Sequence, residues 1–141
     1  MSFARALERR LVLATLFVFA LSLSVRSDEL AEFHAAVELA AAEHRAAMDT
    51  LETSSQQETA AAVQRFRRTW QALNERFTGK HRPAPFADDE QYPTMFMQVD
   101  VRLVGVLLTI DMGNRDAARS GLAPIQETLA QLSVRSAPAS R

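Results

Sequence analysis

Apolar residues recur along most of the chain at alternating steps of three and four, the period of one face of a packed α-helix. Four segments carry this pattern, and the sequence therefore predicts four helices. Over residues 28–52 the expected core stripe is Leu30, His34, Val37, Ala41, His44, Met48 and Leu51. Over residues 55–78 it is Val63, Phe66, Trp70, Leu73 and Phe77. From residue 93 it is Phe96, Val99, Leu103, Val106 and Ile110, and after Asn114 it is Ala118, Leu122, Ile125, Leu129 and Leu132.

Residues that favour helix ends separate these segments. Ser55 and Glu58 have the spacing of a capping box, in which each side chain satisfies an exposed backbone amide at a helix start. Gly79 follows the second stripe, where a left-handed residue commonly ends a helix. Pro93 suits the first turn of the third helix. These signals support the four helices that the periodicity predicts.

The segments without periodicity set the domain boundaries. Residues 79–92 contain two prolines and mixed charge, which is typical of a loop. Pro124 should kink the fourth helix near Ser120, and residues 136–141 should form a disordered tail. We therefore expect an all-α domain over residues 28–135, an antiparallel four-helix bundle with up-down-up-down topology. The long loop could instead run the length of the bundle.

The third helix carries a second apolar stripe beside its core stripe, formed by Met97, Val101, Val104, Leu108 and Met112. One contact with a bundle core does not require both stripes. Exposed apolar surface usually marks a partner site, so the first four of these residues form a candidate interaction face, either for a homodimer or for a periplasmic protein partner. The alternative is that this helix is the central, most enclosed one.

The N-terminal 27 residues have the two-part pattern of an export signal. Three arginines (Arg5, Arg9 and Arg10) precede 15 uncharged residues, 11–25. Cleavage after Ser27 or Ser22 would release a periplasmic or secreted domain. The alternative is an inner-membrane anchor over residues 11–25, although this stretch is shorter than the ~20 residues that a membrane-spanning helix needs. Both outcomes place the bundle outside the cytoplasm.

Composition narrows the functional classes. The chain has no cysteine, which excludes disulfides, iron–sulfur clusters, thiolate zinc sites and haem attached through cysteine. Removing residues 1–27 would take four arginines and one glutamate from the 16 basic and 17 acidic residues, leaving a net charge of −4. An acidic domain of this kind is a poor nucleic-acid binder. The sequence also lacks the common nucleotide-binding and hydrolase motifs, so we expect no enzyme activity and no catalytic residue.

The first predicted helix carries a candidate metal site. His44 and Met48 lie one turn apart on the same face, and imidazole with thioether would suit copper in an extracytoplasmic protein. His34 is a further candidate ligand, but it is ten residues away and would need help from other helices. The competing interpretation is that Met48 fills the core and the histidines form hydrogen bonds at its edge.

Two other groups of polar residues have weaker patterns. His81, Asp88, Asp89 and Glu90 could bind a hard cation, but their order lacks calcium-loop spacing, which favours a solvated loop. Three arginines at positions 65, 67 and 68 lie near Trp70 and resemble a basic, aromatic anion site. Since Trp70 belongs to the core stripe, we expect a packed tryptophan beneath a solvated arginine face.

An exported chain with two helical hairpins and a longer middle loop resembles the periplasmic cytochromes of the c-prime type and their haem-free relatives. The resemblance covers residues 28–135 and implies a four-helix fold with possible dimerisation through a helical face. Haem-bearing members carry Cys-x-x-Cys-His near the end of the fourth helix, whereas residues 129–135 here contain neither cysteine nor histidine. The resemblance thus implies no covalent haem and assigns no functional residue.

Overall fold

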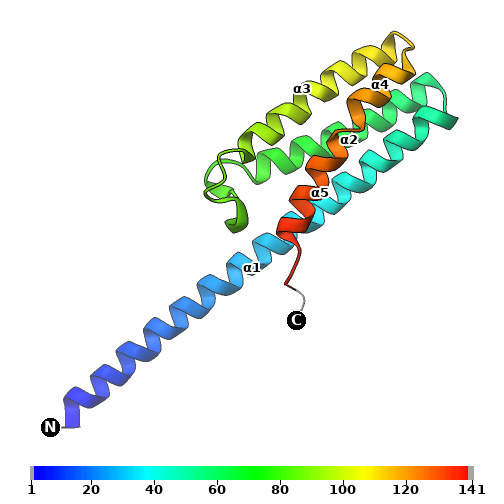
Figure 1. The fold of residues 1–141 in the computed structure, drawn as a ribbon. Helices are drawn as coiled ribbons and strands as arrows, with labels where there is room; N and C mark the ends of the chain where they lie inside the picture. Colours follow the sequence, from blue (N-terminus) through cyan, green and yellow to red (C-terminus); the bar gives the residue numbers. More distant parts are fainter. Residues whose placement is uncertain (1, 140–141) are drawn as a thin grey trace.

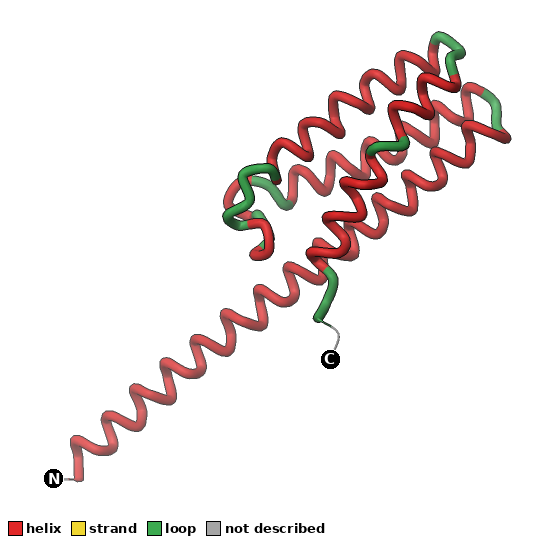
Figure 2. Tube along the Cα trace, viewed as in Figure 1, coloured by secondary structure: helices red, strands yellow, loops and turns green. Residues whose placement is uncertain are grey.

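The structure is a computed structural model that describes the backbone of residues 2–139 and the side chains of residues 26–139. It contains helices α1 (Ser2–Thr53), α2 (Gln56–Arg76), α3 (Tyr92–Asp111), α4 (Arg115–Leu122) and α5 (Ile125–Ser136), and two short 3₁₀ helices, η1 (Gly79–His81) and η2 (Ala84–Phe86). Within the described residues the fold is entirely helical, as the sequence predicts (Figures 1 and 2). The contacts between helices are compatible with a four-helix bundle in which α4 and α5 form the fourth arm.

The first helix is longer than the predicted segment 28–52. Its backbone continues without a break to Ser2, and its N-terminal half projects beyond the other helices (Figure 1). The predicted leader and its cleavage points fall largely on residues 1–25, whose side chains lie outside the described part. Export and cleavage therefore stay predictions.

A two-residue turn joins α1 to α2, and the predicted capping box begins α2. The amide of Glu58 donates to Ser55 Oγ at 3.2 Å, and the amide of Ser55 donates to the Glu58 carboxylate at 2.8 Å. A cap of this kind stabilises a helix by about 1 kcal/mol. All five residues of the predicted α2 stripe are buried. The second helix thus begins and packs as its sequence predicts.

The buried face of α1 differs from the predicted stripe. Val37, His44 and Leu51 are buried as expected, but the residues that alternate with them on the buried face are Phe33, Ala40 and Ala47. The corresponding predicted residues His34, Ala41 and Met48 are half-buried at the edge of the core. The reason is that α1 packs on α2 and α5. The positions of these two helices shift the buried side of α1 by one residue at every second turn.

The fourth predicted helix is broken, not kinked. Its five predicted core residues are all buried, but α4 ends at Leu122 and α5 begins at Ile125. Pro124 has no N–H, and its ring would clash with the carbonyl four residues earlier in a continuous helix. The chain therefore turns at Ala123 and Pro124, and the amide of Gln126 bonds to Ala123 (3.2 Å).

The segment between α2 and α3 is more ordered than the predicted loop. It contains η1 and η2, and it buries Pro83 and Phe86 completely or nearly so. The side chain of Arg135 on α5 lies over the Phe86 ring, 4.2 Å from its centroid, and pairs with Asp89. Apolar and cationic contacts of these residues thus fix the segment against α5.

The C-terminal boundary is also different from the prediction. Ser136 belongs to α5 and is 1% exposed, so it is not part of a disordered tail. Its hydroxyl donates to the carbonyl of Leu132 at 2.7 Å, and His34 Nδ1 lies 2.9 Å from the same oxygen. Because the hydroxyl proton is used, the His34 ring donates. This contact joins α1 to the last turn of α5.

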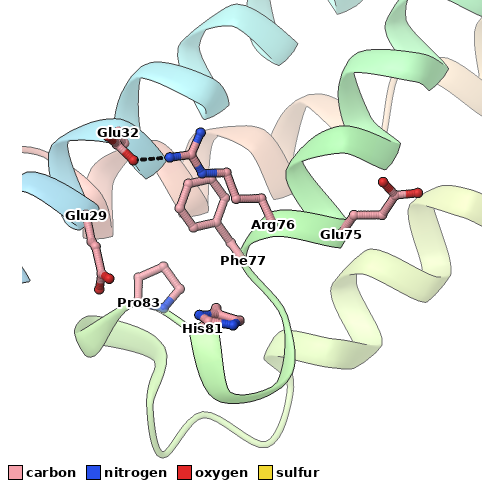
Figure 3. A pocket seen from close by; sticks show the side chains of 7 residues that line it. All are labelled: Glu29, Glu32, Glu75, Arg76, Phe77, His81 and Pro83. Atoms are coloured by element: carbon pink, nitrogen blue, oxygen red, sulfur yellow. Dashed lines mark hydrogen bonds and ion pairs between the residues drawn. The ribbon is translucent and has the colours of Figure 1, made fainter.

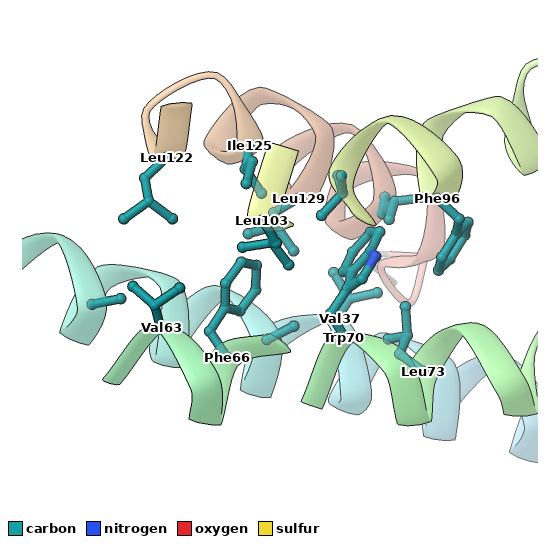
Figure 4. Packing of buried hydrophobic residues seen from close by; sticks show 14 of the residues in the cluster. Val37, Val63, Phe66, Trp70, Leu73, Phe96, Leu103, Leu122, Ile125 and Leu129 are labelled. Atoms are coloured by element: carbon teal, nitrogen blue, oxygen red, sulfur yellow. The ribbon is translucent and has the colours of Figure 1, made fainter. Parts of the chain in front are cut away.

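Aromatic side chains fill much of the core. Trp70 stacks on Phe96 with ring centroids 4.7 Å apart and an interplanar angle of 24°. Phe66 lies beside Trp70, and aliphatic residues from the fourth arm, Ile125 and Leu129, point toward them (Figure 4). This cluster connects α2 and α3 to α5 and determines which face of α3 points inward.

Candidate interaction surface

The second apolar stripe of α3 is solvent-exposed. Met97 is 59% exposed, Val101 68%, Val104 47% and Leu108 61%, and Met112 continues the stripe at the end of the helix with 80%. We call these five residues the outer face of α3. Together they expose on the order of 500 Å² of apolar surface, near the upper end for the largest apolar patch of a monomeric protein.

The packing of α3 explains why this stripe is exposed. Its core stripe, from Phe96 to Ile110, is buried against the other helices, and α3 packs mainly on α2 and α4. The outer face lies on the opposite side of the helix, because its residues are offset by about half a turn from the core stripe. The alternative in which α3 is the central, most enclosed helix is therefore wrong.

Among the described residues, α3 is also the single helix that could span a membrane by length and composition. Only 28% of its most apolar segment is buried inside the structure. A core helix of a soluble protein can pass the same test. Because the inner face of α3 is committed to the aromatic core, a membrane span would require that core to open.

His44 is buried inside the bundle and caps the end of α4 at the break between α4 and α5. Its Nε2 donates to the carbonyl of Leu122 at 2.8 Å, and its ring lies edge-on to Phe66, 5.5 Å between centroids. Leu122 is the last residue of α4, and the amide of Gln126, which would bond to it in a continuous helix, bonds to Ala123 instead. The histidine thus satisfies a carbonyl that Pro124 leaves without its helical partner. Burial lowers the pKa of His44 and keeps the ring neutral.

The predicted metal ligands come together only in part. Met48 is half-buried one turn after His44, packed against the core, while His34 bonds to Ser136 near the other end of the domain. One nitrogen of His44 is already engaged by Leu122. Among the described residues, no three His, Cys, Asp or Glu side chains lie close enough together to hold one metal ion. Copper binding at His44 and Met48 stays a prediction of the sequence.

The polar residues of the 79–92 segment serve several different contacts. Asp89 pairs with Arg135 and accepts the amide of Gln91 at 2.9 Å, contacts that hold its pKa below the usual range. His81 instead lines a pocket of about 460 Å³ between the segment, α1 and α2 (Figure 3). In this pocket Arg76 pairs with Glu32. The remaining lining residues are Glu29, Glu75, Phe77 and Pro83.

The arginines near Trp70 do not form an aromatic anion site, because Trp70 is fully buried. Arg65 Nε lies 3.8 Å from the Glu43 carboxylate, and this ion pair connects α2 to α1.

Asp100 on α3 is a partly buried acidic residue that the sequence pattern did not identify. Burial raises the pKa of its carboxyl, and its Oδ2 accepts from Asn74 at 3.5 Å. The sequence signal for its burial is that Asp100 lies three residues before Leu103 of the core stripe, and residues three apart are neighbours on the surface of a helix.

The chain matches no protein-family model, no curated protein and no solved structure. The architectural resemblance to cytochrome c-prime-like bundles thus receives neither support nor contradiction from these comparisons.

Proposed function

We propose that this chain is an exported, non-enzymatic helical bundle that binds a protein partner, itself included, through the outer face of α3. The single observation that carries the proposal is the exposure of four apolar side chains, Met97, Val101, Val104 and Leu108, along one line of a well-packed helix. The proposal includes an up-down-up-down, antiparallel arrangement of the four arms. Short turns between α1 and α2 and between α3 and α4, together with the contacts of α2 with α3 and of α1 with α5, support it.

The size of the outer face fits a protein interface. A standard interface buries about 800 Å² on each partner, of which a little more than half is apolar. The ~500 Å² on α3 matches that apolar share. Covering two such faces would remove on the order of 1,000 Å² of apolar surface from water, which favours association. The strength of binding depends on how well the two surfaces fit and not on area alone.

The charges beside the outer face favour a protein over a lipid surface. Helices that lie on anionic membranes carry lysines and arginines beside their apolar face. On α3 the charged residues are Asp100, Arg102 and Asp111, and Arg67 of α2 lies near Asp100, so the charges beside this face balance and form no basic rim. A membrane contact through this face would lack electrostatic attraction. In this proposal the membrane is reached only through the leader.

Analytical ultracentrifugation of the full chain, over a wide concentration range in mild detergent, tests the proposal. Val104→Glu and Leu108→Glu introduce charges into the outer face, and we expect each to abolish concentration-dependent association while the helical circular dichroism stays unchanged. Leu39→Glu is the matched control, because Leu39 is 56% exposed on α1. The control should associate like the unmodified chain.

A chain that stays monomeric at high concentration could still bind another protein. Crosslinking in expressing cells, with a photoreactive residue at Val101, would then be expected to give a defined adduct of larger mass. Monomeric behaviour without any adduct would contradict the proposal. Unfolding by Val104→Glu would also contradict it, since that result would place the side chain in the core.

A further inference from the structure

We infer that Met97 and Met112, which lie at the two ends of the outer face, are sites of oxidation by peroxides, and that their sulfoxides weaken the binding of the partner. This inference rests on the proposed function, because it describes the regulation of the same surface. The exposure of the methionines, the scarcity of other oxidisable groups and the chemistry of the sulfoxide support it.

The described methionines differ in exposure. Met112 is 80% exposed and Met97 59%, whereas Met48 and Met95 are half-buried and packed against the core. A peroxide must touch the sulfur in order to oxidise it, so the rate of oxidation follows exposure. Met95 and Met97 lie two residues apart, on different sides of α3. Their difference in exposure therefore comes from packing and not from the local sequence.

Other oxidisable side chains do not compete with the two exposed methionines. The chain contains no cysteine, whose thiolate would otherwise react with the peroxide. Its single tryptophan, Trp70, and its single tyrosine, Tyr92, are fully buried in the aromatic core. Among the described residues, a peroxide that reaches the folded domain therefore reacts first at Met97 and Met112.

The reaction needs no catalytic group from the protein. A lone pair of the thioether sulfur attacks one oxygen of hydrogen peroxide, so that an S–O bond forms and the O–O bond breaks. The second oxygen leaves as hydroxide with both electrons of the broken bond and takes the proton of the first oxygen, which gives water. The sulfur loses two electrons and the peroxide gains them, and the product is methionine sulfoxide.

The sulfoxides change both ends of the outer face. Met97 and Met112 are 15 residues apart, about 22 Å along the helix, with the three aliphatic residues of the face between them. A partner that covers a thioether covers an apolar group, whereas a sulfoxide oxygen is a hydrogen-bond acceptor that loses its water when it is covered. Such a loss lowers affinity by roughly tenfold or more at each position. Since both side chains lie outside the core, the fold should persist.

Peptide mass spectrometry of the full chain after graded treatment with hydrogen peroxide measures the order of oxidation. We expect Met112 and Met97 to be oxidised first, and Met95 and Met48 several-fold more slowly. Trypsin releases Met95 and Met97 on one peptide, residues 81–102, so fragment ions compare them within the same sample. Equal rates at these two positions would overturn the inference, because the difference in exposure would then be absent.

Sedimentation of the same samples measures the effect on binding. If the untreated chain is monomeric, the yield of the adduct from a photoreactive residue at Val101 replaces sedimentation. Each chain is compared with its own untreated sample. We expect oxidation to weaken binding by about tenfold or more while the helical circular dichroism stays unchanged.

Two matched double variants assign the effect to particular methionines. In a chain with Met97→Leu and Met112→Leu, peroxide should leave binding at the level of that chain's untreated sample, because leucine has no thioether. A chain with Met48→Leu and Met95→Leu should stay as sensitive to peroxide as the unmodified chain.

The other outcomes are distinguishable. Oxidation of Met97 and Met112 without loss of binding would overturn the inference and leave the proposed function intact. Loss of binding after peroxide in the variant that lacks both thioethers would also overturn it, since the loss would then arise elsewhere. Loss of circular dichroism together with binding would mean damage to the core and not regulation of the outer face. No association and no adduct at Val101 before treatment would contradict the proposed function itself, and this inference with it.

Discussion

Two glycines lie inside helices of the bundle, Gly105 in α3 and Gly121 in α4, and the same change to alanine should have opposite effects at the two positions. A Cβ added at Gly105 would meet nothing within 4 Å. A Cβ added at Gly121 would lie 2.6 Å from Cγ2 of Val106, a distance that real Cβ contacts do not reach. Val106 is 2% exposed, and a β-branched side chain has little rotamer freedom with which to move away.

The expected magnitudes follow from these two environments. In a helix interior, alanine is more stable than glycine by roughly 0.5–1 kcal/mol. Gly105→Ala should raise the free energy of unfolding by about this amount. Gly121→Ala has the same gain, but it must separate α3 from α4 or displace Val106, and overpacking of a core typically costs about 1–3 kcal/mol. The net effect at Gly121 should be a loss of roughly 1–2 kcal/mol.

Urea unfolding followed by circular dichroism measures both effects. The chain is diluted until it is monomeric, so that the position of Gly105 next to Val104 of the outer face does not contribute. A double-mutant cycle with Val106→Ala provides the internal control. Removing the valine methyl groups should relieve the clash, so that Gly121→Ala becomes neutral or stabilising in that background. Equal stabilisation by both alanines in the unmodified background would refute the close contact between α3 and α4.

Two further results are expected of His44. The pKa of His44 is lowered in the folded state from an ordinary value of 6.5, so the unfolded chain binds more protons, and the free energy of unfolding should fall as the pH drops from 7 toward 5. His44→Leu should be less stable than the unmodified chain at pH 7, but its urea unfolding should lack this pH dependence. Because the Leu122 carbonyl occupies Nε2 of His44, we expect calorimetric titration with Cu(I) or Cu(II) to give the same heats for the full chain, His44→Ala and Met48→Leu. A binding heat that both variants lose would establish the copper site that the sequence predicts.

Local signals in the sequence predicted most of the helices correctly. The start of α2 at the Ser55 capping box depends on atoms three residues apart, so the sequence alone is sufficient to place it. The core stripes of α2, α3 and the fourth arm depend on helical periodicity, and all of their residues are buried. Pro124 marked a disturbance of the fourth arm because its effect on the backbone is local, but the sequence did not distinguish a kink from a full break.

The candidate interaction face could be predicted only as one of two alternatives. Periodicity identifies both apolar stripes of α3, since each repeats with the helical period. Whether the second stripe is exposed or covered depends on where the other helices lie, and that information is absent from α3 itself. The stacking of Trp70 on Phe96 fixes the inner side and leaves Val101 and Val104 in solvent.

The tertiary structure alone decided the roles of residues whose partners are far away in the chain. His44 bonds to Leu122, 78 residues later, and this contact gives the candidate ligand a structural role as the cap of a broken helix. Phe33 takes the place of the predicted His34 because α2 and α5 determine the buried arc of α1. Helix ends and amphipathic faces arise from interactions between near neighbours in the chain, so the sequence by itself determined them. Packing between the arms sets the rotation of each helix and the partner of each buried polar group, and only the folded chain brings those residues together.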